Sequence, residues 1–248
     1  MSRRFWLPVL LVLLALAAIV YAANASRFAS RAAGVAALLA HRGIAQQFDT
    51  RDLRNDTCTA VRMLPSTHDY LENTIASLRA SLAAGADWVE IDVHPTTDEQ
   101  FAVFHDWTLD CRTDGRGVTR ERSMTELKRL DIGYGYTTDD GKTFPFRGKG
   151  VGLMPSLEDV LATFPDRRLL INMKSRDASE GEKLALALEK LPAAQRAQLA
   201  AYGGDEPVAE FRRRLPAMLT VSRGSLKACS CAILYMAGSA VCRMPVAI

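Results

Sequence analysis

Polar and apolar positions alternate most clearly over residues 88–93. Side chains of a strand alternate between two faces, so Glu90 and Asp92 share one face and three branched apolar residues share the other. After a short polar turn, a second apolar run over residues 101–104 ends in His105. The pattern predicts two neighbouring strands that carry their chemistry at the C-terminal ends, which is the layout of an α/β barrel.

The rest of the chain alternates between strand-like and helix-like patterns. Further strands are predicted at residues 35–40, 168–174, 199–202 and 218–221. Helices are predicted at residues 72–84, 123–130, 155–164, 179–191 and 208–215. Strands that alternate with helices favour a parallel sheet and the α/β class. A TIM (β/α)8-type barrel needs eight strands and about six are found, so we expect a barrel that is incomplete at the C-terminus.

Capping residues mark the starts of three predicted helices. Asn73 is expected to be the N-cap of the first, and Ser123 the N-cap of the second. Ser156, followed three residues later by a carboxylate, fits a capping box at the start of the third. Two long polar segments without a clear period, residues 44–70 and 134–152, are predicted to be loops.

The N-terminal segment is apolar. Residues 5–23 carry no charge and follow Arg3 and Arg4, so the run is long enough to cross a bilayer with its basic start on the cytoplasmic side. An A-x-A pattern at its end also fits a signal-peptide cleavage site. We therefore expect residues 1–25 to be a transmembrane anchor or a signal peptide, and residues 35–248 to be an exported barrel domain, either periplasmic or anchored in the membrane and facing outward.

Composition narrows the class of protein without identifying it. The 248 residues are 48% hydrophobic and 24% charged, with a formal net charge of +3, which is ordinary for a globular α/β domain. Because Lys and Arg are scattered along the chain, we expect no nucleic-acid partner.

Five cysteines become relevant if the domain is exported, because disulfides persist in oxidising compartments. Cys58 lies in the first long loop, and Cys111 follows the strand that ends in His105. If both segments cover the same face of the barrel, a bridge between these two cysteines is expected. The alternative is two unpaired small hydrophobic residues.

The predicted strand ends carry a set of polar residues that suits phosphate-ester chemistry. The set comprises His41, Arg42, Glu90, Asp92, His105, Asn172 and Lys174. Two histidines can act as general base and general acid, because imidazole titrates near neutral pH. A carboxylate pair on one strand face can bind a hard cation such as Ca²⁺ or Mg²⁺. Positive side chains can neutralise the charge that develops on phosphate oxygens.

With these residues in order, the sequence resembles the glycerophosphodiester phosphodiesterase family. The motifs that carry the resemblance are HRG at 41–43, ENT at 72–74, GAD at 85–87, ExDV at 90–93, HD at 105–106 and RT at 112–113. The resemblance implies a TIM barrel that hydrolyses glycerophosphodiesters to an alcohol and glycerol 3-phosphate with a divalent cation. We expect a glycerophosphodiester or a lysophospholipid-like molecule as the substrate.

The resemblance also implies a role for each matching residue. The implied acid and base are His41 and His105; the implied cation ligands are Glu90 and Asp92, with Glu72 as a further candidate; and the implied phosphate contacts are Arg42 and Lys174. Which histidine is the base is not visible in the sequence.

Two departures from the family pattern leave other functions open. Asn172 stands where the family has a carboxylate, so we expect weaker cation binding. Two further strands implied after about residue 221 are not found, and an open barrel would expose sheet edges. The alternatives are a phospholipase of the C or D type, and an impaired barrel that only binds phosphodiesters.

Overall fold

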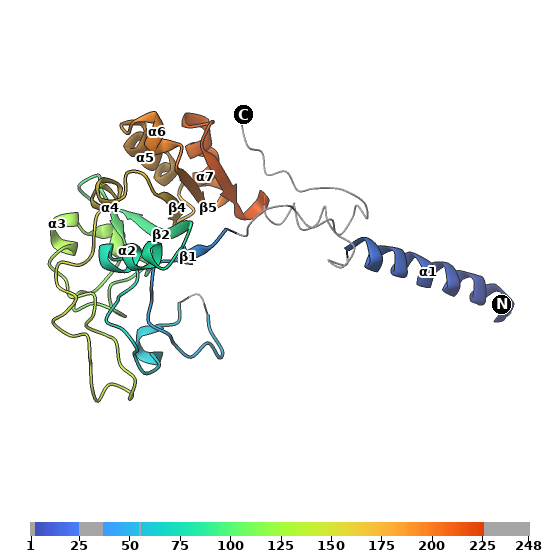
Figure 1. The fold of residues 1–248 in the computed structure, drawn as a ribbon, viewed down its shortest axis with the longest axis horizontal. Coiled ribbons are helices and arrows are strands. Elements are labelled where there is room, and N and C mark those ends of the chain that lie inside the picture. Colours follow the sequence, from blue (N-terminus) through green and yellow to red (C-terminus); the bar gives the residue numbers. More distant parts are fainter. Residues whose placement is uncertain (1–2, 25–36, 55, 226–248) are drawn as a thin grey trace. The chain divides into compact units, whose positions relative to one another are not determined.

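The computed structural model describes residues 3–24, 37–54 and 56–225 (Figure 1). The elements in chain order are α1 (Arg3–Asn24), β1 (Leu39–His41), η1 (Ala60–Arg62), α2 (Ile75–Ala83), β2 (Trp88–Pro95), β3 (Phe101–Val103), η2 (Thr119–Glu121), α3 (Met124–Leu127), α4 (Leu157–Thr163), β4 (Arg168–Met173), α5 (Ala178–Glu189), α6 (Ala193–Arg196), β5 (Leu199–Gly203), α7 (Asp205–Arg214) and β6 (Leu219–Ser222).

The sheet confirms the α/β class. Its strands lie in the order β1-β2-β4-β5-β6, and each neighbouring pair on this path is parallel. Helices connect successive strands, with α2 between β1 and β2, α4 before β4, α5 and α6 before β5, and α7 before β6 (Figure 1). Parallel strands in sequential order with helical crossovers are the arrangement of a TIM-type barrel.

The direction of β3, the strand just before His105, was not predicted from the sequence. β3 pairs antiparallel with the C-terminal half of β2, with Val93 opposite Val103. Only five residues separate the two strands, which is too short for a parallel crossover, so the chain forms a hairpin. The hairpin turns the chain back, and the Phe104 N–H donates to the carbonyl oxygen of Asp92 at 3.0 Å. His105 therefore lies beside the middle of β2.

The helix starts match the predicted caps in two of three cases. Ser123 and Ser156 each form a capping box, for α3 and α4 respectively. At α2 the predicted N-cap, Asn73, is wrong. Thr74 caps that helix in a capping box with Ser77, because the Asn73 backbone is in the left-handed region (φ 58°) and its side chain bonds to β2 instead.

Two apolar clusters hold the domain together. The larger one lies between the sheet and helices α2, α4, α5 and α7, and it includes the apolar face of β2 predicted from the alternation: Val89, Ile91 and Val93. The second cluster contains Leu71, Phe104 and Phe146, and it belongs to the long irregular segments. The predicted loops are therefore packed around a core of their own.

The side chains of the N-terminal helix α1 are exposed from Trp6 to residue 22. In the parts of the chain that the structure covers, no helix has both the length and the apolar character needed to cross a membrane. The role of residues 1–25 as an anchor or a signal peptide stays a prediction. The final residues, 226–248, lie outside the described part, as do the three cysteines among them.

Candidate active site

Polar side chains from four parallel strands meet at one edge of the sheet. The register sets His41 opposite Glu90, and Asp92 opposite Asn172, which in turn lies opposite Tyr202. Because the carboxyl ends of parallel strands share one edge, residues far apart in the chain become neighbours there.

The carboxylates of β2 are buried and held by hydrogen bonds. The Tyr202 hydroxyl donates to Oε1 of Glu90 at 2.7 Å. Asp92 accepts from the side-chain amides of Asn172 at 2.8 Å and of Asn73 at 3.1 Å. Oε2 of Glu90 is buried and has no hydrogen-bond partner among the described residues. One carboxylate is thus satisfied by the protein, while the other keeps a free oxygen.

Burial and charge separate the two carboxylates in their titration. Burial, together with the charge of Asp92, raises the pKa of Glu90 to about 7. Burial also opposes the ionisation of Asp92, but the charges of Lys174, His105 and Arg42 outweigh it and lower the pKa of Asp92. Asp92 is therefore the permanent negative charge of the pair.

The HRG motif places Arg42 by a strained turn. Arg42 and Gly43 both have a positive φ, 61° and 75°. A Cβ atom on Gly43 would lie 2.6 Å from Oγ and 2.8 Å from the carbonyl carbon of Ser77, so only glycine fits between β1 and α2. The turn is fixed further because the Arg42 N–H donates to the carbonyl oxygen of Glu90 at 3.1 Å.

Two cations face the carboxylates. Nζ of Lys174 lies 3.3 Å from Oδ1 of Asp92. Nη1 of Arg42 donates to Oε1 of Glu72 at 3.1 Å, and Nε of Arg42 lies 3.1 Å from Oδ2 of Asp92 without the alignment of a hydrogen bond. Arg42 therefore lies between the carboxylates of Glu72 and Asp92, and its Nε is buried without a hydrogen-bond partner among the described residues.

The two predicted acid–base histidines lie close to this cluster. The His41 side chain is 65% exposed, and its Nε2 is 3.8 Å from Oε2 of Glu90. Partial burial and the charge of Arg42 lower the pKa of His41, and His105 contributes in the same direction. Nδ1 of His105 is 2.7 Å from Oδ1 of Asp106, which leaves the other ring nitrogen for a ligand.

A third histidine, His94, lies on the same face of β2 and is fully buried. Its Nε2 is 3.4 Å from the carbonyl oxygen of His105, and burial lowers the pKa of His94 to about 4. His94 is therefore neutral at physiological pH, and its ring contacts the backbone of His105.

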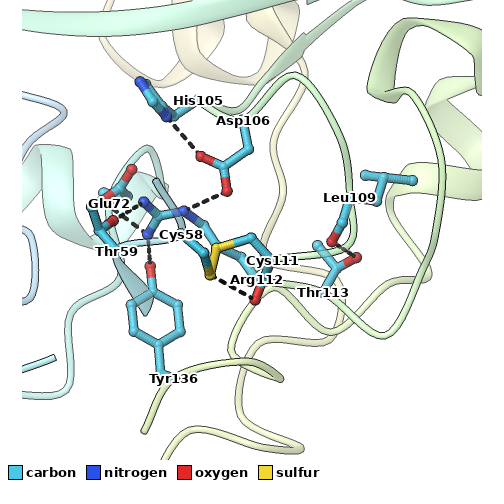
Figure 2. Close-up of a disulfide and its surroundings, with 10 residues drawn as sticks. All are labelled: Cys58, Thr59, Glu72, His105, Asp106, Leu109, Cys111, Arg112, Thr113 and Tyr136. Carbon is cyan, nitrogen blue, oxygen red and sulfur yellow. Dashed lines mark hydrogen bonds and ion pairs between the residues drawn. A yellow bond between two sulfur atoms is a disulfide. The ribbon is translucent and has the colours of Figure 1, made fainter. Parts of the chain in front are cut away.

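Arg112 connects the HD and ENT motifs (Figure 2). Its Nε donates to Oδ2 of Asp106 at 2.9 Å, and its Nη1 lies 3.2 Å from Oε2 of Glu72. The residue before it, Cys111, forms a disulfide with Cys58, and the two Cα atoms are 5.5 Å apart. The bridge anticipated between the two segments is thus present, and it adjoins the site.

The donors at this edge suit a hard cation only in part. Both oxygens of Glu72 are engaged by arginines, Oε1 by Arg42 and Oε2 by Arg112. Its role as a cation ligand stays a prediction. Across the described residues, no group of three or more His, Cys, Asp or Glu side chains is arranged to hold an ion. Oε2 of Glu90 is the carboxylate oxygen of β2 without a hydrogen-bond partner among the described residues. Oδ1 of Asp92 contacts Asn172 and Lys174, and Oδ2 contacts Asn73 and Arg42.

Sequence reasoning missed three residues of the site. Tyr202 is the last residue of the strand predicted at 199–202. Its hydroxyl group at a strand end could have indicated a place in the site. Asn73 was expected to cap a helix rather than to hold Asp92. Arg112 was noticed only as part of a motif, because its partners lie 6 and 40 positions away and no periodicity connects them.

Comparisons with known proteins agree with this arrangement. Residues 41–225, more than half of the chain, match the model of the glycerophosphoryl diester phosphodiesterase family. A glycerophosphodiester phosphodiesterase of Caldanaerobacter subterraneus is 33% identical over 103 residues, which cover 42% of this chain and 39% of the relative. One from Bacillus subtilis is 34% identical over 125 residues, which cover 48% and 41%. The matches thus span well under half the length of these curated relatives.

Solved structures share the fold. A glycerophosphoryl diester phosphodiesterase domain from Mycobacterium tuberculosis has a TM-score of 0.61 at 19% identity, covering 82% of this chain and 65% of that one. An Oleispira antarctica phosphodiesterase, solved with sn-glycerol-3-phosphate, has a TM-score of 0.53 at 21% identity, covering 75% and 65%. At these identities the likeness establishes the fold alone. With the family match over residues 41–225, it follows that this chain belongs to the glycerophosphoryl diester phosphodiesterase family.

Proposed function

We propose that the chain hydrolyses glycerophosphodiesters to an alcohol and glycerol 3-phosphate. The observation that carries the proposal is the placement of His41 and His105 close to the buried carboxylates Glu90 and Asp92. Family membership and the product found in the Oleispira neighbour give further support.

The two histidines supply the proton transfers. One imidazole accepts a proton from the attacking water as its oxygen bonds to phosphorus. The other donates a proton to the alcohol oxygen as its bond to phosphorus breaks, so that the alcohol leaves and glycerol 3-phosphate remains. Asp106 accepts a hydrogen bond from Nδ1 of His105, which orients the ring so that Nε2 faces the substrate. Each histidine must return to its first protonation state before the next turnover.

Positive charge at the strand ends binds the phosphate. Arg42 and Lys174 bring two positive charges to this place, one beside each oxygen of Asp92. We assign Glu90, Asp92 and the side-chain oxygen of Asn172 as the residues that would hold a divalent cation, Ca²⁺ or Mg²⁺. Such an ion, when bound, supplies further positive charge to the phosphate oxygens.

The proposal is tested by the purified full chain and glycerophosphocholine, with release of glycerol 3-phosphate measured in Ca²⁺, in Mg²⁺ and in chelator. We expect turnover that depends on the cation, and His41→Ala and His105→Ala should each lower kcat by about 100-fold or more, as loss of general acid or base does. His68→Ala, which changes a histidine in the loop before α2, is the matched control. Equal activity of the wild type and His41→Ala would overturn the assignment.

We also propose that the domain is exported. The Cys58–Cys111 bridge supports this, because disulfides form and persist in oxidising compartments. Fractionation of expressing cells, with labelling of free thiols, should find the bridged chain outside the cytoplasm. A fully reduced chain confined to the cytoplasm would contradict the proposal.

A further inference from the structure

A continuous series of charged contacts runs from one acid–base histidine to the carboxylates of β2. His105 contacts Asp106 at 2.7 Å, Asp106 contacts Arg112 at 2.9 Å, and Arg112 contacts Glu72 at 3.2 Å. Glu72 in turn contacts Arg42 at 3.1 Å, and Arg42 approaches Asp92 at 3.1 Å. Arg112 is the junction of this series, because it is the cation that touches both the histidine branch and the phosphate-binding branch.

Each nitrogen of the Arg112 guanidinium contacts at least one polar partner. Its side chain is only 4% exposed. Besides its two carboxylates, it donates from Nη1 to the Tyr136 hydroxyl at 2.5 Å and from Nη2 to Oγ1 of Thr59 at 2.7 Å. All three nitrogens of the planar fork therefore have partners, and such a fork has one orientation that serves them all.

The disulfide fixes the two segments that supply these contacts. Cys58 precedes Thr59, and Cys111 precedes Arg112. The disulfide therefore joins the chain next to Arg112, the donor, to the chain next to Thr59, one of its acceptors (Figure 2). Residues 53 positions apart in the chain are in this way held within hydrogen-bond distance.

We propose that Arg112 is a positioning residue, which fixes Asp106 and through it the orientation of His105 relative to the phosphate-binding residues. The inference rests on the proposed function, since His105 matters for catalysis only if the site turns over a phosphodiester. The polar contacts of Arg112 are with Asp106, Glu72, Tyr136 and Thr59, so its effect on His105 passes through the carboxylate of Asp106.

The test compares the wild-type full chain with Arg112→Lys, which keeps the positive charge and loses the fork. A misplacement of about 1 Å costs about 100-fold in rate, so we expect kcat to fall by about 10- to 100-fold while KM changes by less than about threefold. Val160→Ala changes a residue on the buried face of α4 and is the control for a general loss of stability. It should leave kcat and KM within about twofold of the wild-type values.

A second readout needs no substrate. ¹⁵N–¹H spectra of the histidine rings, assigned with His105→Gln, report whether Nδ1 of His105 donates to a carboxylate. We expect this signal in the wild type and in Val160→Ala, and a shifted or exchange-broadened signal in Arg112→Lys. If the wild type hydrolyses no glycerophosphodiester but the signal still moves in Arg112→Lys, the proposed function fails and the positioning role stands.

Unchanged kcat and an unchanged His105 signal in folded Arg112→Lys would overturn the proposal. Should that variant fail to fold, Arg112→Gln combined with Glu72→Gln removes one positive and one negative buried charge together, which limits the cost of an unpaired ion. The same displacement of the His105 signal is expected there, and its absence would equally count against the positioning role.

Discussion

Individual residues at this site are held in conformations that a free chain avoids. Arg42 and Asn73 both have a backbone in the left-handed region, and the Asn73 N–H donates to the carbonyl oxygen of Arg42 at 2.9 Å. Such strain persists only where surrounding contacts enforce it. Here those contacts are the pairing of Arg42 with Glu72 and the two hydrogen bonds between Asn73 and Asp92.

Asp106 makes stability at acid pH a test of the Arg112 contact. Burial alone would raise its pKa, but the charge of Arg112 and the hydrogen bond from His105 lower it from 3.8 to about 2. A lowered folded-state pKa contributes stability above the unfolded-state pKa, and this contribution is lost as the pH falls from about 4 to about 2. A shift of that size corresponds to about 2 kcal/mol.

We therefore expect Asp106→Asn to be less stable than the wild type at pH 6, and the difference to shrink as the pH falls from about 4 to about 2. Urea unfolding at a series of pH values measures it. A difference between the two proteins that stays constant across this range would contradict the ionised contact.

At the scale of elements, sequence patterns predicted the strands and most of the helices between them, but not the hairpin of β2 and β3. The alternation over residues 88–93 identified both faces of β2, because burial of one face follows directly from the period of a strand. The hairpin of β2 and β3 was missed, since an apolar run carries no sign of strand direction. That hairpin determines where His105 lies, so the composition of the site was more predictable than its geometry.

The contacts made through side chains were the least predictable part. Tyr202, Asn73 and Arg112 act on residues that neither helical nor strand periodicity brings near them in the sequence. Glu72 was expected near a divalent metal ion, and its pairing with two arginines was not anticipated. Such pairings depend on tertiary packing, which a single sequence does not encode as a local pattern.

The disulfide joins two of the irregular segments, and its removal should act on both stability and activity. Cross-linking residues separated by 53 positions typically stabilises a fold by about 2–4 kcal/mol. We expect Cys58→Ser with Cys111→Ser to lose stability of this order and to lower kcat more than KM, because Arg112 loses its tether.

Denaturant unfolding and steady-state kinetics of the double serine variant provide the measurement, and treatment of the wild type with dithiothreitol should reproduce both effects. Full activity and unchanged stability of the double variant would show that packing alone holds these segments.

For the whole molecule, the sheet brings together residues that lie far apart in the chain, between positions 41 and 202. The order of the parallel strands places His41 opposite Glu90, and Asn172 between Asp92 and Tyr202. The function class was predictable because the chemistry lies at strand ends in order along the chain.

The most direct test of the account is ³¹P NMR of glycerophosphocholine incubated with the purified full chain and Ca²⁺ or Mg²⁺. The account predicts that the diester signal is replaced by that of glycerol 3-phosphate, and that chelator or His105→Ala suppresses the change. Formation of phosphocholine instead would mean that a different P–O bond is cleaved. A diester signal that persists in the presence of folded protein and cation would contradict the proposed hydrolysis.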